Sequence, residues 1–147
     1  MSGDRGVLGA APLRVKLMVR VESSAFPDAA LIASQQIVPD FRRESETEID
    51  AALQTWKQTE FVEIRQDGGF LSGYRDRPNS VSLVSLNGHR TLKWAGEFVR
   101  KDANWAEQDA LIYAAGGPVW VRLVAPAGLL EDARPAFEQF IESIRSP

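Results

Sequence analysis

The chain contains no cysteine and only one histidine, His89, among its 147 residues. The lack of cysteine excludes disulfide bonds, thiolate nucleophiles and cysteine-ligated metal sites. A single histidine also excludes a metal site built from several imidazole ligands. The sequence therefore predicts no metal centre and no cofactor.

Clustered positive charge and long apolar runs are also missing. The formal net charge is -3 and the basic residues form no block, so phosphate-directed binding to nucleic acid is not expected. No segment approaches the roughly 20 apolar residues that a membrane-spanning helix needs. The apolar run Val7–Ala11 is shorter than the hydrophobic region of a signal peptide. We expect a cytoplasmic protein with no transmembrane segment.

Length and composition fit a single domain. A chain of 147 residues with 44% hydrophobic and 25% charged residues can bury one core. Residues 1–12 are small and rich in glycine and alanine, and we expect them to form a flexible tail. The domain is predicted to span residues 13–147.

The first half of the chain predicts two strands and a helix. Arg14–Glu22 alternates apolar and charged residues with period two, which is typical of a half-buried strand. Residues 30–38 suit a strand or a short helix, and we favour the strand. Ser45–Lys57 predicts a helix, because Ser45 and Glu48 can form a capping box. An apolar stripe runs along this helix through Ile49, Ala52, Leu53 and Trp56.

A first hairpin is predicted around Asn87-Gly88, a dipeptide that strongly favours a two-residue turn. It joins Ser80–Leu86 to His89–Val99. Before it, Phe61–Arg65 is expected to be a short strand and Gln66–Asn79 a long glycine-rich loop. The hairpin register pairs Leu86 with His89 and Val81 with Trp94, and it places Val81, Leu83, Leu92, Trp94 and Phe98 on one apolar face.

A second hairpin is predicted around Gly116-Gly117, between Trp105–Ala115 and Val119–Ala125. Its predicted register pairs Ile112 with Val121. One face of this hairpin is wholly apolar and is expected to be core: Ala110, Ile112, Val119, Val121 and Leu123. A helix over Arg134–Arg145, with Pro135 in its first turn, should cover that face with Phe137, Phe140, Ile141 and Ile144.

The two hairpins together form a four-stranded antiparallel meander, Ser80–Ala125. Two helices with one apolar stripe each must pack on the faces of such a sheet. The predicted fold class is α+β, an antiparallel sheet with two main helices.

This order of elements resembles the PsbP-like superfamily, which includes photosystem PsbP proteins, the Ran-binding import factor Mog, DcrB-related proteins and the LpqN family. The resemblance implies an α/β/α sandwich. It also implies a non-catalytic binding or assembly role, with partners that differ between branches. The segments that carry it are Leu31–Pro39, Leu86–Leu92, Glu107–Tyr113, Val119–Leu123 and Phe137–Arg145.

Three polar features have structural explanations. His89 follows a tight turn with no serine or aspartate arranged beside it, which indicates a surface or edge residue. Asp109 and Arg122, placed diagonally across the second hairpin, predict an ion pair worth about 0–1 kcal/mol if exposed. Four acidic residues gather where a helix dipole favours anions, and we interpret them as a solvated helix start rather than a metal or acid–base site: Glu44, Glu46, Glu48 and Asp50.

The second face of the last hairpin carries Tyr113 and Trp120, with Trp105 near its start. Aromatic residues and arginine are common anchors of protein interfaces, so these three residues either form a recognition patch or lie beneath the second helix layer. The glycine-rich loop adds further candidates, because loops concentrate binding residues: Phe70, Tyr74, Arg75 and Arg77.

The sequence therefore predicts a non-enzymatic protein-binding adaptor or assembly module, for which a second copy of the chain is one candidate partner. A second hypothesis is a pocket for a small apolar ligand or lipid beneath the curved sheet. A third is an enzyme that uses the acidic cluster with His89, for which no catalytic arrangement is recognisable.

Overall fold

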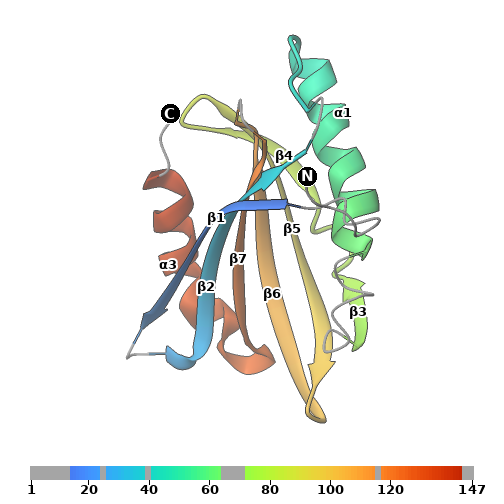
Figure 1. Ribbon diagram of the computed structural model, residues 1–147. Coiled ribbons are helices and arrows are strands. Elements are labelled where there is room, and N and C mark those ends of the chain that lie inside the picture. Colours follow the sequence, from blue (N-terminus) through green and yellow to red (C-terminus); the bar gives the residue numbers. More distant parts are fainter. Residues whose placement is uncertain (1–13, 24–25, 39–40, 64–71, 115–116, 144–147) are drawn as a thin grey trace.

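The computed structural model describes residues 14–23, 26–38, 41–63, 72–114 and 117–143. Figure 1 shows a curved sheet with one helix on either side. In chain order, the elements are β1 (Arg14–Ser23), β2 (Phe26–Ile37), α1 (Glu46–Trp56), η1 (Lys57–Phe61), β3 (Ser72–Asp76), β4 (Ser82–Leu86), β5 (His89–Arg100), β6 (Ala103–Ile112), β7 (Val119–Pro126), η2 (Ala127–Leu129) and α3 (Leu130–Ser143).

The strands form one antiparallel sheet in the order β1-β2-β7-β6-β5-β3, with β4 also paired to β5. β4 pairs with the first half of β5 and β3 with the second half, so both lie along the same edge of β5. β7 lies between β2 and β6, which joins the N-terminal hairpin to the meander β4–β7. The predicted α+β class and the four-stranded meander are confirmed.

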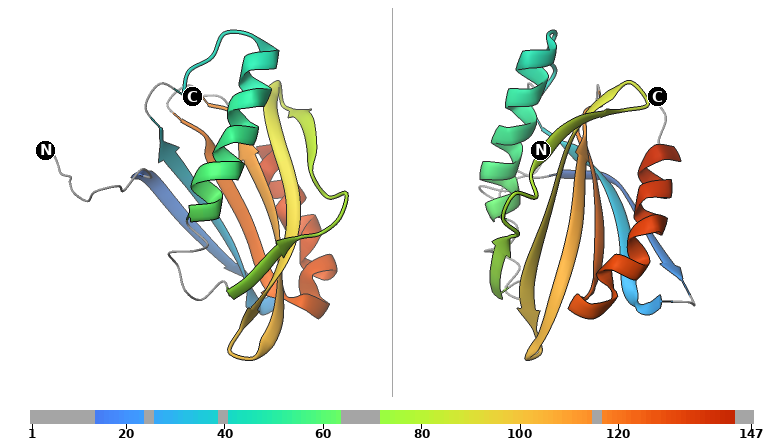
Figure 2. Two further views of the ribbon diagram at one scale, coloured as in Figure 1. Left: turned by 90° about the vertical axis from the view of Figure 1, so that its right-hand side faces the viewer. Right: turned by 180° about the vertical axis from the view of Figure 1, so that it is seen from behind.

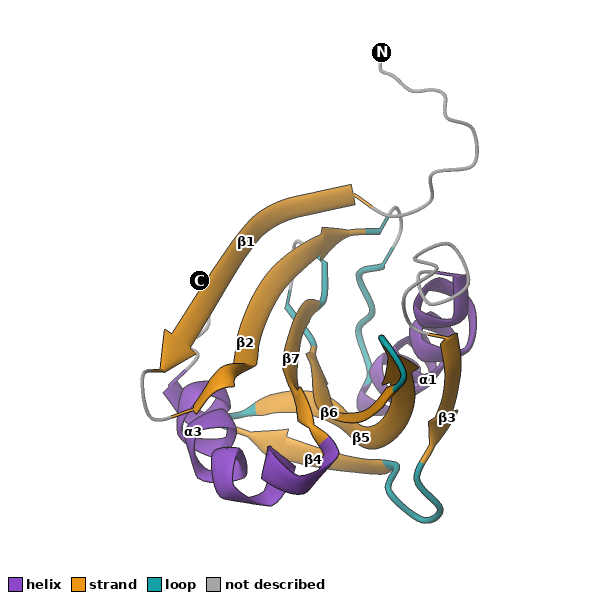
Figure 3. Ribbon diagram, turned by 90° about the horizontal axis from the view of Figure 1, so that it is seen from below, coloured by secondary structure: helices purple, strands orange, loops and turns teal. Residues whose placement is uncertain are grey.

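Each face of the sheet is covered by one helix (Figures 1 and 2), and Figure 3 shows from below how the strands curve between them. The α3 face holds the apolar side chains that the second hairpin predicted as core. Phe137 and Ile141 of α3 are almost completely buried there, with Ala110, Ile112, Val121 and Leu123 of the sheet. Ile144, the last predicted stripe residue, lies outside the described residues.

The α1 face has a second core rich in aromatic side chains. Leu53 and Trp56 of α1 pack with residues from the middle strands, namely Leu92, Trp94, Leu111 and Trp120. The N-terminus of α1 is capped as expected, because the Glu48 N–H donates to Ser45 Oγ at 3.1 Å. The Glu48 carboxylate accepts from the Glu44 N–H at 3.3 Å instead of from the cap residue itself.

The two predicted hairpins have different outcomes. Leu86 pairs with His89 as predicted, but the ladder between β4 and β5 ends at Ser82, and Val81 is 48% exposed. In the second hairpin Ile112 pairs with Val119 rather than with Val121, a shift of two residues. Because side chains alternate with period two, a shift of two leaves every residue on its predicted face.

Three predicted boundaries are wrong. The predicted strand Phe61–Arg65 is helical over its described residues: the chain continues from α1 through the π-helical turn η1 to Phe61, and residues 62 and 63 are still helical. Residues 64 and 65 lie outside the described residues. This extension buries the Phe61 ring against Trp94 and Trp120, at centroid distances of 5.1 and 5.5 Å. The predicted loop Gln66–Asn79 contains a strand, β3, and α3 begins at Leu130, which places Pro135 in its second turn.

Candidate functional site

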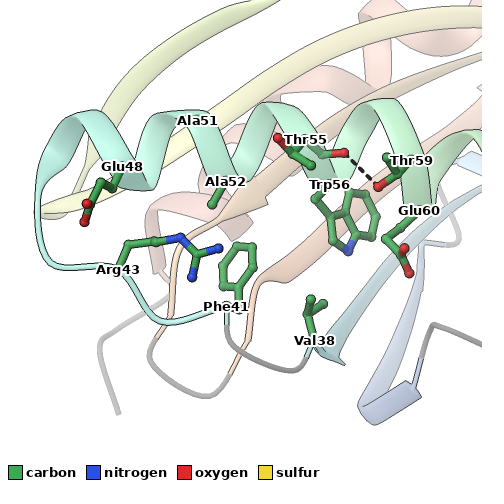
Figure 4. A pocket seen from close by; sticks show the side chains of 10 residues that line it. All are labelled: Val38, Phe41, Arg43, Glu48, Ala51, Ala52, Thr55, Trp56, Thr59 and Glu60. Carbon is green, nitrogen blue, oxygen red and sulfur yellow. Dashed lines mark hydrogen bonds between the residues drawn. The ribbon is translucent and has the colours of Figure 1, made fainter.

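A groove of about 320 Å³ runs along α1 and is open to solvent. One wall is the helix face that carries residues spaced three and four apart, and the other wall is the segment that leads from β2 into α1. Figure 4 shows the order of the side chains, from Glu48 and Arg43 at one end, past Phe41 and Trp56, to Thr59 and Glu60 at the other end. The lining residues are Val38, Phe41, Arg43, Glu48, Ala51, Ala52, Thr55, Trp56, Thr59 and Glu60.

Tyr113 fixes the position of the second groove wall, the segment that leads from β2 into α1. Its hydroxyl accepts a hydrogen bond from the Arg43 N–H at 2.8 Å and donates one to the Arg43 carbonyl at 3.1 Å. Its ring stacks on Phe41 with the centroids 5.6 Å apart. Because Tyr113 follows β6, it ties the segment before α1 to the sheet and fixes the width of the groove.

Trp120 supports the groove from beneath. It is only 4% exposed, and its ring contacts Trp56 edge-on at 5.2 Å between centroids. An exposed patch that includes Trp120 is therefore wrong: α1 covers this side chain, which is the alternative that the sequence left open. Tyr113 is half-buried and is engaged with Arg43 and Phe41.

The stretch of the groove from Trp56 to its Glu60 end contains two buried polar atoms without a hydrogen-bond partner among the described residues. These are the Trp56 indole Nε1 and the Glu60 carboxylate Oε1. Burial and the negative charge of Glu63 raise the pKa of Glu60. Since buried donors and acceptors are almost always paired in folded proteins, this end of the groove has unused hydrogen-bonding capacity.

A second set of ionisable groups lies on the face of the sheet that α1 packs against. Glu107 and Asp109 of β6 are both fully buried, and Arg122 of β7 has 15% of its side chain exposed. Arg122 Nη2 donates to Glu107 Oε1 at 3.2 Å, and Trp120 Nε1 donates to Asp109 Oδ1 at 2.8 Å. Asp109 and Arg122 face each other directly across the strands. The predicted ion pair is therefore confirmed, with Arg122 Nε 3.8 Å from Asp109 Oδ1, but the two residues are paired directly rather than diagonally, and Asp109 is buried.

This buried cluster contains two acids and one base. Burial, the Glu107 charge and a hydrogen bond with Glu107 raise the pKa of Asp109 well above its usual value, and Arg122 only partly opposes them. Burial also acts against the Arg122 cation, but the two carboxyl groups outweigh it and raise the pKa of the guanidinium. With one proton retained on Asp109 the cluster is neutral, which is the least costly state for buried ionisable groups.

Two comparisons with known proteins found nothing: no family model and no curated protein matches the chain. Solved structures are similar to it. PA94 from Pseudomonas aeruginosa, a protein of unknown function, has a TM-score of 0.60 at 12% identity over 92% of this chain and 84% of that one. Cyanobacterial PsbP (CyanoP) from Synechocystis sp. PCC 6803 has a TM-score of 0.56 at 11% identity over 99% of each chain. LpqN of Mycobacterium tuberculosis, involved in cell envelope biogenesis, gives 0.45 at 13% identity over 86% and 78%.

The chain has a PsbP-like fold. The agreement with CyanoP spans both chains almost end to end, so it covers the whole arrangement of sheet and helices. The predicted superfamily resemblance is confirmed at the level of the fold.

The remaining predicted site residues of this PsbP-like domain are spread over other surfaces. Arg75 and Trp105 line a second hollow of about 270 Å³ near the β5–β6 turn. Trp105 is half-buried, stacks on Phe98 at 6.4 Å, and has Arg100 over its ring at 5.0 Å. Tyr74 and Arg77 are already engaged, and Phe70 lies outside the described residues.

Tyr74 extends from β3 across Gly96 of β5, where an added Cβ atom would clash with its ring and hydroxyl. Its hydroxyl donates to Asp76 Oδ1 at 2.8 Å. Burial, followed by the charges of Asp109 and Glu107, raises the pKa of this phenol. Arg77 Nε donates to Glu97 at 3.1 Å. Both side chains therefore fasten the β3 edge of the PsbP-like sheet.

The acidic start of α1 serves a structural role. Asp50 accepts two hydrogen bonds from Arg90, at 2.9 and 3.0 Å, which connects α1 to β5. No group of three or more potential metal ligands occurs in the part of the chain that the structure describes. Within the same ranges, no helix is long and apolar enough to cross a membrane.

Proposed function

We propose that this PsbP-like domain is a non-catalytic binding module that holds a segment of a protein partner in the groove beside α1. The observation that carries the proposal is the pair of buried, unpaired polar atoms at Trp56 and Glu60 in a solvent-open groove. A partner that supplied the missing hydrogen bonds would recover the cost of leaving these atoms unpaired, about 1–3 kcal/mol each.

The groove also has the composition of an interface. Its centre is apolar and contains two aromatic side chains, Phe41 and Trp56, while its charged residues lie at the ends. This combination of an apolar centre with a polar rim is typical of protein interfaces. None of the residues that line the second hollow, near Trp105, has a buried polar atom without a hydrogen-bond partner. The described residues therefore favour the groove as the binding site.

A role in catalysis would need ionisable groups that a substrate can reach. One such set, Glu107 with Asp109 and Arg122, is buried on the face of the sheet that α1 packs against. Its charges are balanced internally, which fits a structural role. This arrangement supports a binding function over a catalytic one.

The test compares two alanines at exposed helical positions. Ala51 lines the groove, whereas Ala136 lies on the outer face of α3. Ala51→Arg should fill the groove without disturbing the core, and Ala136→Arg adds the same side chain elsewhere. Both variants should unfold within a few degrees of the wild type.

The two variants and the wild type are then used to capture partners from cells of the source organism, with quantification by mass spectrometry. We expect a protein that is retained by the wild type and by Ala136→Arg but lost with Ala51→Arg. Equal capture by all three proteins would show that the groove does not bind a partner.

A second candidate function is the binding of a small, mostly apolar ligand in the same groove. A volume of about 320 Å³ lies at the lower end of the range for ligand pockets, which is about 300–1,000 Å³. Native mass spectrometry of the protein purified from its own cells would show a co-purifying mass that Ala51→Arg lacks. The unmodified mass alone in both samples would argue against a small ligand.

A further inference from the structure

We propose that the occupant of the groove is an extended peptide segment that presents an apolar side chain to Phe41 and Trp56 and a lysine or arginine side chain to Glu60 and Glu63. This assignment rests on the proposed function and adds the chemistry of the partner. It follows from three properties of the groove: its hydrogen-bonding groups, its apolar centre and its charge.

The hydrogen-bonding groups match a peptide backbone. Trp56 Nε1 is a donor and Glu60 Oε1 an acceptor, and they lie one helical turn apart on the groove wall (Figure 4). Each peptide unit offers one carbonyl acceptor and one N–H donor. An extended segment can therefore accept from Trp56 and donate to Glu60, whereas a hydrocarbon chain can satisfy neither atom.

A π-helical turn shapes this end of the groove. η1 follows α1 directly, and it places Glu60 on the groove wall while Phe61 packs into the core. Within this region the Thr59 hydroxyl donates to the Thr55 carbonyl at 2.8 Å. Single π-helical turns are found frequently at functional sites, and here the turn presents the acceptor that the peptide would use.

The apolar centre calls for a hydrophobic side chain. Trp56 is 2% and Phe41 6% exposed, so both rings are fixed by packing against the sheet. Ala52 leaves space between the helix and these rings. Rigid aromatic side chains with space beside them are well suited to receive an apolar anchor residue.

The charge of this end favours a cation. Glu60 lines the groove, and Glu63, three residues further along the same helical segment, is exposed beside it. The two side chains lie close enough for the charge of Glu63 to raise the pKa of Glu60. The nearest basic residue of the same helix, Lys57, is directed to the other side, where its Nζ binds Asp76 at 2.6 Å and lies over the Trp94 ring at 5.3 Å. A lysine or arginine of the bound segment would relieve the repulsion between the two carboxylates.

The experiment is the selection of binders from a random peptide library on the wild-type protein and on three variants: a double charge reversal at the groove, a single charge reversal elsewhere and a charge-neutral substitution. Glu60→Lys with Glu63→Lys reverses the charge of the groove end, and Glu142→Lys, at an exposed position of α3, is the control. Glu60→Gln keeps the size of the side chain and serves where the double variant does not fold.

We expect the wild type and Glu142→Lys to select peptides with an apolar residue close to a lysine or arginine. The double variant should select acidic residues at the basic position and bind the wild-type peptides at least tenfold more weakly by calorimetry. Glu60→Gln should weaken them about threefold to tenfold.

Two results would overturn the assignment. The first is that the wild type selects neutral or acidic peptides, or that the charge variants bind the selected peptides with unchanged affinity, while Ala51→Arg abolishes binding. In that case the groove binds peptides, but its charge does not determine which peptides it binds. The second is a failure to obtain any peptide sensitive to Ala51→Arg, which removes the peptide occupant and leaves the partner-capture experiment to decide the binding function separately.

Discussion

The buried cluster of Glu107, Asp109 and Arg122 allows a test of whether its carboxyl groups stabilise the protein by balancing charge or by packing. The cluster holds two acids and one base, and a neutral state requires a single proton on the acid pair. Removing one acid by an amide substitution leaves one carboxylate to balance Arg122. Removing both leaves the mostly buried arginine without a counter-charge.

Asp109→Asn should therefore be tolerated. The amide oxygen can still accept from Trp120 Nε1, and the amide N–H₂ can donate to Glu107 as the protonated acid does. When the wild type unfolds at pH 7, Asp109 loses its proton and ionises in water, which favours the unfolded state. Asparagine cannot ionise, so we expect the variant to be more stable than the wild type by about 1–4 kcal/mol. Glu107→Gln should cost little, because it removes the negative charge that keeps Asp109 protonated.

The double variant should behave differently. Introducing Glu107→Gln into the Asp109→Asn protein leaves Arg122 without a counter-charge, for which about 3–5 kcal/mol is typical. We expect about 3 kcal/mol, the lower end, because 15% of the Arg122 side chain remains exposed. Urea unfolding followed by tryptophan fluorescence gives the four free energies of this cycle.

One outcome of this cycle would refute charge balance. If Glu107→Gln lowers the free energy of unfolding equally with aspartate or with asparagine at position 109, the two acids do not jointly neutralise Arg122. If both single variants lose several kcal/mol, the carboxylates are needed for packing or for specific hydrogen bonds rather than for charge.

The same cluster predicts a pH dependence. The pKa of Asp109 is raised in the folded state, mainly by burial and by Glu107, so the native protein binds a proton that the unfolded chain releases above about pH 3.9. The stabilisation is fully present below that pH and is lost as the pH rises through the folded pKa, by about 1.4 kcal/mol per pH unit. The stability of Asp109→Asn should lack this slope, and parallel curves for the two proteins would contradict the raised pKa.

Four further substitutions test the fold. Ser45→Ala should cost about 1 kcal/mol in thermal unfolding, because the N-cap bond to Glu48 is lost. Trp120→Ala should cost about 3–5 kcal/mol in urea unfolding, and a loss below 1 kcal/mol would contradict its burial. Gly96→Ala should cost about 1–3 kcal/mol in the wild type and much less with Tyr74→Ala, because the added Cβ meets the tyrosine ring; equal costs would argue against that contact.

The sequence was informative where local chemistry determines the structure. Asn87-Gly88 fixed the first hairpin turn because both residues adopt positive φ, 51° and 81°, as a type I′ turn requires. For the second hairpin, a turn at the glycine pair predicts a pairing that differs by two residues from the observed register. Each side chain still lies on its predicted face of the sheet, because side chains alternate between the two faces and a register shift of two residues is even.

Structure that depends on contacts between distant segments was less predictable. Phe61-Val62 has the composition of a strand, yet the helix continues through it because Phe61 finds two tryptophan rings on β5 and β7. Trp120 could not be assigned to the surface or the core from its strand alone, since its cover is a helix more than 60 residues earlier. The signal for the buried cluster was present in the alternation: Glu107 and Asp109 share a strand face with Trp105 and Leu111, and Leu111 is completely buried.

Two of the residues that the sequence predicts as partner contacts, Tyr113 and Trp120, support the groove instead of lining it. Tyr113 fixes the position of Arg43 through two hydrogen bonds, and Trp120 supports the Trp56 ring whose indole N–H faces the groove. A residue that only shapes a groove should influence binding without any contact of its own. Tyr113→Phe keeps the stack on Phe41 but removes both hydrogen bonds, so it should lower stability by only about 1 kcal/mol. The same change should weaken Ala51-dependent partner capture, and unchanged capture would show that the wall does not need this anchor.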